Sequence, residues 1–109
     1  MSSPSEAVFQ ILLSLADEPR HGLGIAEEVE RRTGRRVRLG ASTLYTAIRR
    51  MNADQWIQEA TAGADEDPRR RFYSLTPAGR RVLEKEAMRL DSLVRDARGK
   101  SVIPDEGRA

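Results

Sequence analysis

The sequence predicts a mostly α-helical fold with one small β-hairpin, in the order helix, helix, helix, strand, strand, helix. Two observations support this prediction. Apolar residues recur at helical period in four segments, and two short strand-like segments are separated by a polar run rich in helix-breaking residues. A chain of 109 residues can bury one modest core, so we expect one domain.

The first three helices have recognisable ends. A serine cap followed by proline, Ser3-Pro4, predicts the start of the first helix, which we expect to extend to about Asp17. The second helix begins near Gly22 and stops at Gly34. The third covers residues 41–54, after a basic connector that is longer than the tightest helix-turn-helix.

The third helix presents two different faces. Apolar residues at positions i, i+3, i+4 and i+7 face a core, whereas the opposite face carries hydroxyl and guanidinium groups and no acid. Such groups can bond phosphate oxygens and the edges of guanine or adenine. The alternative is an ordinary solvent-exposed face. The candidate DNA-binding residues of this helix are Ser42, Thr43, Tyr45, Thr46, Arg49 and Arg50.

A second basic cluster, Arg69, Arg70 and Arg71, comes directly before the second predicted strand. The strands cover residues 56–59 and 72–75, so these arginines lie at the tip or on the returning strand of the hairpin. There they can contact phosphates, or they can guard a sheet edge against pairing. A basic helix followed by a basic hairpin is typical of a winged helix-turn-helix protein on duplex DNA, and this is the predicted fold class.

Positive charge is concentrated in one block, although the net charge of the chain is only +2. Residues 31–50 contain seven arginines and no acid, and the block from Arg31 to Arg71 carries +5 against −3 for the rest of the chain. This distribution is the electrostatic pattern of a nucleic-acid binder. Arg36 and Arg38, in the connector before the third helix, are therefore further candidate DNA-binding residues.

Thr76-Pro77 predicts the start of a fourth helix that extends to about Arg98. A helix of about twenty residues is roughly 30 Å long, which is more than one small core covers. Self-association is therefore favoured over packing on its own domain alone. Its apolar residues step by four and three, as in the seam of a two-stranded coiled coil. The candidate dimerisation residues are Leu83, Ala87, Leu90, Val94 and Ala97.

We expect a winged-helix DNA-binding domain over residues 1–76, a dimerisation helix over 77–98 packed on the same domain, and a disordered tail over 99–109. The sequence has no cysteine, and its single histidine, His21, has no partners at metal-ligand spacing. We therefore expect no metal, cofactor or enzymatic activity, and we interpret His21 as a helix-start residue that bonds nearby backbone. The lack of a membrane span or signal peptide favours a cytoplasmic protein.

Three motifs together resemble the PadR family of bacterial transcriptional regulators, in the short form with a single C-terminal helix. They are His21-Gly22, Thr43-Leu44-Tyr45 and RRFYSLTPAGR over residues 70–80. The resemblance covers about residues 7–97. It implies phosphate and base contacts from the third helix, and a dimer in which the last helix pairs with its mate and with the first helix. The chain departs from the family pattern at Leu23, at Thr46 and in the turn over residues 52–55.

In that family, aromatic or other hydrophobic small molecules commonly bind near the dimer interface and release DNA. The last helix here has no aromatic residue, so Phe9 and Met88 are the candidate effector-binding residues. The predicted function is a homodimeric repressor that binds an inverted-repeat operator in double-stranded DNA and is released by a small hydrophobic effector. The alternative is a winged-helix module that binds an acidic protein partner without specific DNA binding.

Overall fold

The computed structural model describes residues 3–61, 67 and 69–104. It confirms a mostly helical fold, with one strand more than predicted. Among these residues, no helix is long and apolar enough to cross a membrane. The elements, in chain order, are α1 (Glu6–Ser14), β1 (Arg20–His21), α2 (Gly22–Arg32), α3 (Ala41–Ala53), β2 (Ile57–Ala60), β3 (Phe72–Leu75) and α4 (Pro77–Gly99).

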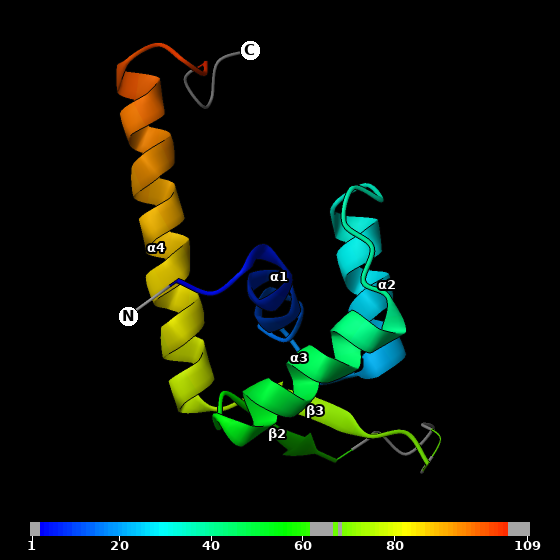
Figure 1. Ribbon diagram of the computed structural model, residues 1–109. Helices are drawn as coiled ribbons and strands as arrows, with labels where there is room; N and C mark the ends of the chain where they lie inside the picture. The colour runs from blue at the N-terminus through cyan, green and yellow to red at the C-terminus, as the bar shows by residue number, and fades with distance from the viewer. Residues whose placement is uncertain (1–2, 62–66, 68, 105–109) are drawn as a thin grey trace.

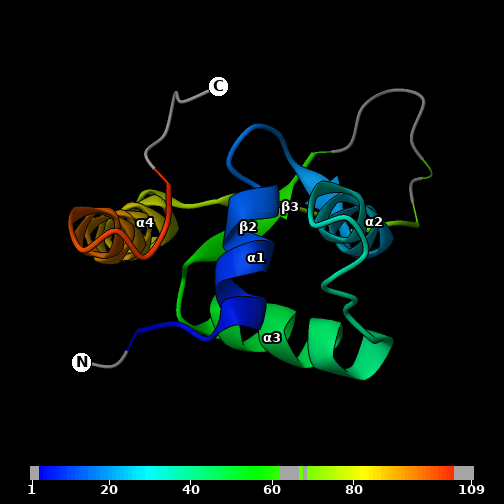
Figure 2. The same cartoon turned by 90° about the horizontal axis from the view of Figure 1, so that it is seen from above.

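Helix α1 lies at the centre of the molecule, with α4 on one side and α2 on the other, and α3 and the sheet lie beneath it (Figures 1 and 2). Ile11 and Leu12 of α1 have no exposed surface, and neither have Ile25 and Val29 of α2. The apolar face predicted for α3 packs onto the same core, where Leu44, Ile48 and Met51 are buried.

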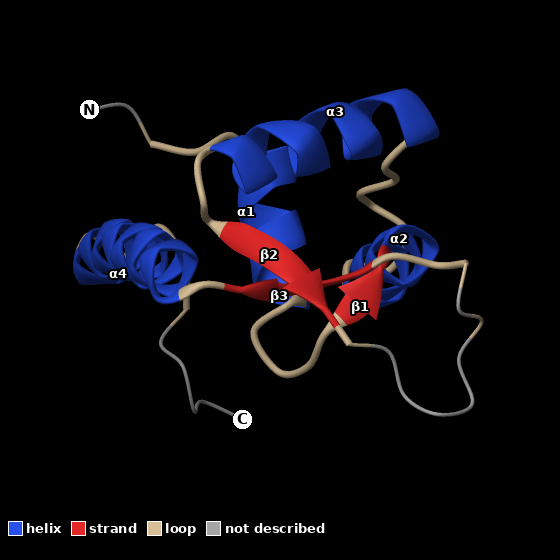
Figure 3. Cartoon of the chain, turned by 90° about the horizontal axis from the view of Figure 1, so that it is seen from below, coloured by secondary structure: helices blue, strands red, loops and turns tan. Residues whose placement is uncertain are grey.

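The sheet has three antiparallel strands in the order β1-β3-β2 (Figure 3). Strands β2 and β3 form the predicted hairpin. Strand β1 was not predicted, because its two residues, Arg20 and His21, show neither the alternation nor the β-branched residues that mark a strand. They pair with Tyr73 and Phe72 of β3. This pairing ties the start of α2 to the returning strand of the hairpin.

The start of α1 differs from the prediction. Its N-cap is Ser5, whose side-chain oxygen accepts the backbone N–H of Val8 at 3.2 Å. Ser3 and Pro4 therefore precede the helix and do not open it. Both serines fit the local pattern of a cap, but Glu6 directly follows Ser5, where a negative charge favours the first helical turn.

Charged side chains complete the other end of α1, which comes at Ser14 and not at the predicted residue 17. Arg20 Nε donates to the Ser14 carbonyl at 2.8 Å, and Arg80 of α4 donates to the Ala16 carbonyl at 2.8 Å. The last carbonyls of a helix have no partner within the helix, and the Arg20 bond satisfies the one at Ser14, whereas Ala16 lies just beyond the helix. The second of these bonds also holds the start of α4 against α1.

A junction between α3, the sheet and α4 fixes the direction of the last helix. The Trp56 carbonyl accepts the backbone N–H of Thr76 at 3.0 Å. The Thr76 hydroxyl donates to the Gln55 carbonyl and accepts the N–H of Gly79 at 3.0 Å, so it caps α4. Gln55 has φ of 62°, in the left-handed region that glycine adopts most readily. A Cβ at Gly79 would lie 1.9 Å from the Trp56 oxygen, so this position requires glycine.

Only the first half of α4 packs closely on the rest of the chain. Leu83 is buried in the core. Glu86 is also buried, and its hydrogen bonds from Arg89 hold the pKa of the Glu86 carboxyl below its usual range. The second half of α4 extends past α1 (Figure 1), where Leu93 and Val94 remain 52% and 38% exposed. An apolar stripe therefore continues beyond the core that it covers.

The end of the chain was predicted to be a disordered tail over residues 99–109. Residues 99–104 complete α4 and form a turn, in which the Val102 N–H donates to the Ala97 carbonyl at 2.9 Å. Residues 105–109 lie outside the described part of the chain, as do residues 62–66 and 68 of the predicted hairpin turn.

The junction predicts that Gly79→Ala destabilises the protein by about 2–3 kcal/mol, because the new methyl group meets a backbone carbonyl that cannot swing away. Gly99→Ala is the matched control, since it lies on the same helix with nothing within 4 Å of its added Cβ. Its effect should stay within about 1 kcal/mol. Urea unfolding of the two variants measures the difference, and equal stabilities would contradict the close contact.

Candidate nucleic-acid interface

The outer face of α3 is open to solvent. Neither Arg49 nor Arg50 forms an ion pair with a carboxylate in the part of the chain that the structure describes. Arg49 makes one long hydrogen bond, of 3.4 Å, to the Thr46 hydroxyl. These cations are therefore available to a ligand. The exposed candidate residues of this face are Ser42, Thr43, Tyr45, Thr46, Arg49 and Arg50.

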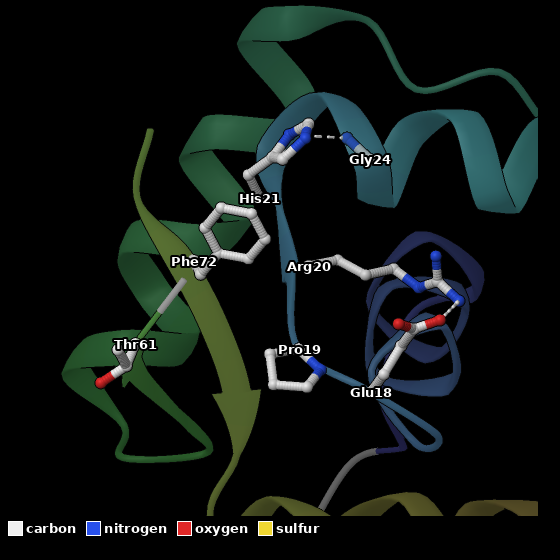
Figure 4. Close-up of a pocket in the computed structure, with 7 residues that line it drawn as sticks. All are labelled: Glu18, Pro19, Arg20, His21, Gly24, Thr61 and Phe72. Carbon is white, nitrogen blue, oxygen red and sulfur yellow. Dashed lines mark hydrogen bonds and ion pairs between the residues drawn. The ribbon is translucent and has the colours of Figure 1, made fainter. Parts of the chain in front are cut away.

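The start of α2 positions one edge of this face. His21 is the N-cap of α2, and its Nδ1 accepts the backbone N–H of Gly24 at 3.0 Å (Figure 4), which confirms the helix-start role predicted for it. Phe72 of β3 meets the His21 ring edge to face, with 5.1 Å between the ring centroids. The Tyr45 side chain lies directly against Gly22, where a Cβ would come within 2.5 Å of the Tyr45 hydroxyl oxygen.

A cleft of about 350 Å³ joins α2, α3 and the hairpin arginines. Tyr45 of α3, the start of α2 and residues 69–71 all line it. The structure thus brings together two groups of candidate residues that are about twenty positions apart in the sequence. Donors from three elements converge on one open cavity.

The three hairpin arginines differ in their partners. Arg69 pairs with Asp67 at 3.1 Å, and its hydrogen bonds hold the pKa of the Asp67 carboxyl below its usual value. Arg70 Nη1 lies 2.8 Å from Nε2 of His21. Neither Arg70 nor Arg71 has a carboxylate partner among the described residues. Within the described residues, two of the three positive charges therefore have no carboxylate partner.

The connector arginines are partly neutralised by acids from outside their block. Arg36 pairs with Glu6 at 3.2 Å, and Arg38 pairs with Glu30 at 3.5 Å. Both pairs are exposed, so they are weak and exchangeable. Charge counted along the sequence overestimates the positive field here, because α1 and α2 bring their carboxylates next to the connector.

Arg50 lies at the other edge of the α3 face. It lines a cleft of about 300 Å³ together with Asp54, Trp56 and residues 3–5. A neighbouring cleft of about 220 Å³ lies between Trp56 and Val82 of α4. Trp56 lines both clefts. The sequence predicted it only as the first residue of a strand, which in the structure begins one residue later, at Ile57.

The predicted effector residues do not line these clefts. Phe9 is half-buried against the core, and Met88 is 73% exposed on α4. Neither residue therefore contributes to the two clefts beside Trp56. Within the described residues, no group of histidine, cysteine, aspartate or glutamate side chains could hold a metal ion.

The predicted dimerisation residues share one stripe of α4 but differ in burial. Leu83 packs in the core of its own chain, whereas Leu90 and Ala97 are half-buried. Ala87 and Val94 are exposed. The stripe is thus covered at its beginning and open further along the helix.

The profile described as the transcriptional regulator PadR-like family matches residues 11–85. The chain belongs to this family. The resemblance drawn from the three sequence motifs is confirmed. PadR-like proteins are transcriptional regulators and not enzymes.

Two relatives illustrate the match. The transcriptional regulator Rv3488 of Mycobacterium tuberculosis is 36% identical over 89 residues, which cover 82% of this chain and 79% of that protein. An uncharacterized 37.1 kDa protein in transposon TN4556 of Streptomyces fradiae is 38% identical over 105 residues, or 94% of this chain. The chain spans only 28% of the length of that second relative.

Solved structures confirm the predicted winged helix-turn-helix fold of this PadR-like chain. A transcriptional regulator from Clostridium thermocellum matches with a TM-score of 0.69 and 23% identity, over 88% of this chain and 92% of that one. Bacillus subtilis PadR, solved in complex with operator DNA, matches with a TM-score of 0.64 and 18% identity, over 74% of this chain and 46% of that one.

The contact between Gly22 and Tyr45 predicts that Gly22→Ala turns the Tyr45 ring out of its place without unfolding the protein. The added methyl group meets only the far end of a flexible side chain, so we expect the melting temperature to change by less than about 4 °C. The chain has only two tyrosines, so NMR can follow the Tyr45 ring directly. Unchanged Tyr45 resonances would contradict the contact, and Gly99→Ala again serves as the control.

Proposed function

We propose that this PadR-like chain is a sequence-specific DNA-binding regulator that acts as a cytoplasmic homodimer. The observation that carries the proposal is the cleft shared by Tyr45 and the hairpin arginines, since it gathers phosphate- and base-binding groups from separate elements. The Bacillus subtilis PadR structure, which contains operator DNA and has the same fold, supports DNA binding by this chain.

In this proposal, α3 enters the major groove and the hairpin contacts the DNA backbone. The exposed hydroxyls and guanidinium groups of α3 bond base edges and phosphates, and Arg69, Arg70 and Arg71 bond phosphates only. Arg36 and Arg38 exchange their exposed carboxylate partners for phosphate oxygens on the flanking backbone. Residues 1–76 then form the DNA-binding unit.

The open stripe of α4 is the proposed dimer interface, with Leu90, Val94 and Ala97 at its centre. One recognition helix spans too few base pairs for specific binding in a genome, so a second copy is needed. Two copies related by a two-fold axis would read an inverted repeat with half-sites about one helical turn apart, or a multiple of it.

The dimer is further proposed to act as a repressor that a small hydrophobic effector releases from DNA. The cleft between Trp56 and Val82 is a better effector site than Phe9 and Met88, because it lies between α4 and the rest of the chain. A hydrophobic ligand there would move α4 and so change the spacing of the two recognition helices. The two recognition helices would then no longer match the spacing of the operator half-sites, and the protein would release the DNA.

The rival function is a protein-interaction module whose arginines meet an acidic partner. Binding to random duplex DNA across a salt series distinguishes the two functions. DNA binding releases counterions, so its affinity should fall steeply as salt rises. Absence of binding even at low salt would reject the proposal.

Arg49→Ala should lower the ratio of specific to non-specific affinity by about tenfold, because a major-groove arginine discriminates between bases by about 1–3 kcal/mol. Arg70→Ala should weaken both kinds of binding alike, since a phosphate contact reads no sequence, and should lower the salt slope by about one unit. The measurement compares random duplex with the duplex that the protein selects from a random pool. The opposite pattern would reverse the assignment of the two elements.

Val94→Asp should convert the dimer into a monomer, because the charge would be buried without a partner in the interface. The helical circular dichroism should remain, since Val94 is already 38% exposed in the single chain. Met88→Asp is the matched control: it lies on the same helix outside the stripe and is 73% exposed, so it should leave the dimer intact. Sedimentation velocity measures whether each variant is a monomer or a dimer. A Val94→Asp protein that is still a dimer would show that the interface does not include Val94.

A further inference from the structure

His21 makes two polar contacts that its ring cannot satisfy together. Nδ1 accepts the Gly24 backbone N–H at 3.0 Å, and Nε2 lies 2.8 Å from Nη1 of Arg70. The ring is half-buried and held against Phe72, so neither nitrogen can easily turn away. The first contact begins α2, and the second joins α2 to the hairpin.

The donor and acceptor count decides which contact is a hydrogen bond. A neutral imidazole has one N–H and one lone pair, and a backbone N–H can only donate. Nδ1 must therefore carry the lone pair, which leaves the hydrogen on Nε2. The Arg70 guanidinium also has only donors. Two donors thus face each other across 2.8 Å while the α2 cap is intact, and protonation of the ring would remove the remaining lone pair.

Within the part of the chain that the structure describes, no side chain offers these two donors an acceptor. Arg70 has no carboxylate partner among the described residues, and the nearby Asp67 is taken by Arg69. The cleft at this point is about 350 Å³ in volume and open to solvent, with the Tyr45 side chain and Arg71 on its walls. An anionic oxygen in the cleft, within hydrogen-bond distance of both Nε2 and the guanidinium, would accept from both donors and remove the conflict.

We propose that His21 and Arg70 together bind a phosphate group of the DNA backbone, a role that rests on the proposed function. The phosphate oxygens accept from the Nε2–H of His21 and from the Arg70 guanidinium, while Nδ1 keeps the α2 cap. Free inorganic phosphate has the same chemistry, so the experiments include it as a separate arm. The site would bind one phosphate between the start of α2 and the hairpin, and so fix the position of both elements on the duplex.

NMR of the imidazole tests the first step of this proposal. His21 is the only histidine, so long-range proton–nitrogen spectra show a single ring. In the neutral ring we expect Nδ1 to be unprotonated and Nε2 to carry the hydrogen, because only the Nδ1 lone pair can accept the Gly24 N–H. A duplex should shift and protect the Nε2–H signal. A ring with its hydrogen on Nδ1 would overturn the proposal, because Nε2 would then accept from Arg70.

Binding measurements with two variants test the second step. His21→Asn keeps the cap, because asparagine is a preferred N-cap residue whose oxygen can accept the Gly24 N–H, but its shorter side chain cannot reach the cleft. We expect about tenfold weaker duplex binding with an unchanged salt slope, because a neutral donor displaces no counterion. Arg70→Ala should weaken binding and lower the slope by about one unit. If both residues hold one phosphate, the double variant should lose less than the sum of the two losses.

Arg95→Ala is the matched control, since it removes an arginine from the far half of α4 and should leave binding unchanged. Wild-type protein that binds no duplex at any salt would reject the proposed function itself. If the wild-type protein binds duplex and His21→Asn binds it equally tightly, this site is rejected while the proposed function stands. A His21 signal that responds to inorganic phosphate but not to duplex would assign the site to the free anion and overturn the DNA contact.

Discussion

The contact between Gly79 and the Trp56 carbonyl is the constraint on which the arrangement of the molecule depends. It holds the start of α4 against the segment that leaves α3, at a point where two backbones meet and neither side can move aside. The Thr76 cap and the left-handed Gln55 serve the same junction. In a dimer formed through α4, this junction would also set the angle and distance between the two α3 helices.

The other end of α3 is held in a different way. The Tyr45 side chain rests on Gly22, the His21 ring caps α2, and the short strand β1 joins that point to β3 (Figure 3). The His21 cap and the β1–β3 pairing are polar, and both lie beside an open cleft. Close packing at Gly79 therefore fixes the direction of α4. At the other end of α3, the hairpin arginines and Tyr45 line an open cleft instead of packing closely. The first arrangement favours rigidity, and the second leaves donors available to a ligand.

The features that the sequence predicted well are those that depend on neighbours along the chain. The α3 stripe, the Thr76-Pro77 cap and the hairpin strands all follow from local periodicity or local bonds. Features that depend on distant residues were missed: the two-residue strand β1, which exists only through β3, and the ion pairs of Arg36 and Arg38 with Glu6 and Glu30. The candidate site was therefore found as two separate clusters, while the cleft that joins them was not.

Backbone NMR of the protein with its selected duplex tests the central claim most directly, because it reports every amide at once. If α3, the start of α2 and the hairpin form one DNA interface, the largest shifts fall on residues 21–24, 42–50 and 69–73 together. The second half of α4 should then change little on addition of DNA to the preformed dimer. Shifts confined to α4, or to the hairpin without α3, would contradict the account.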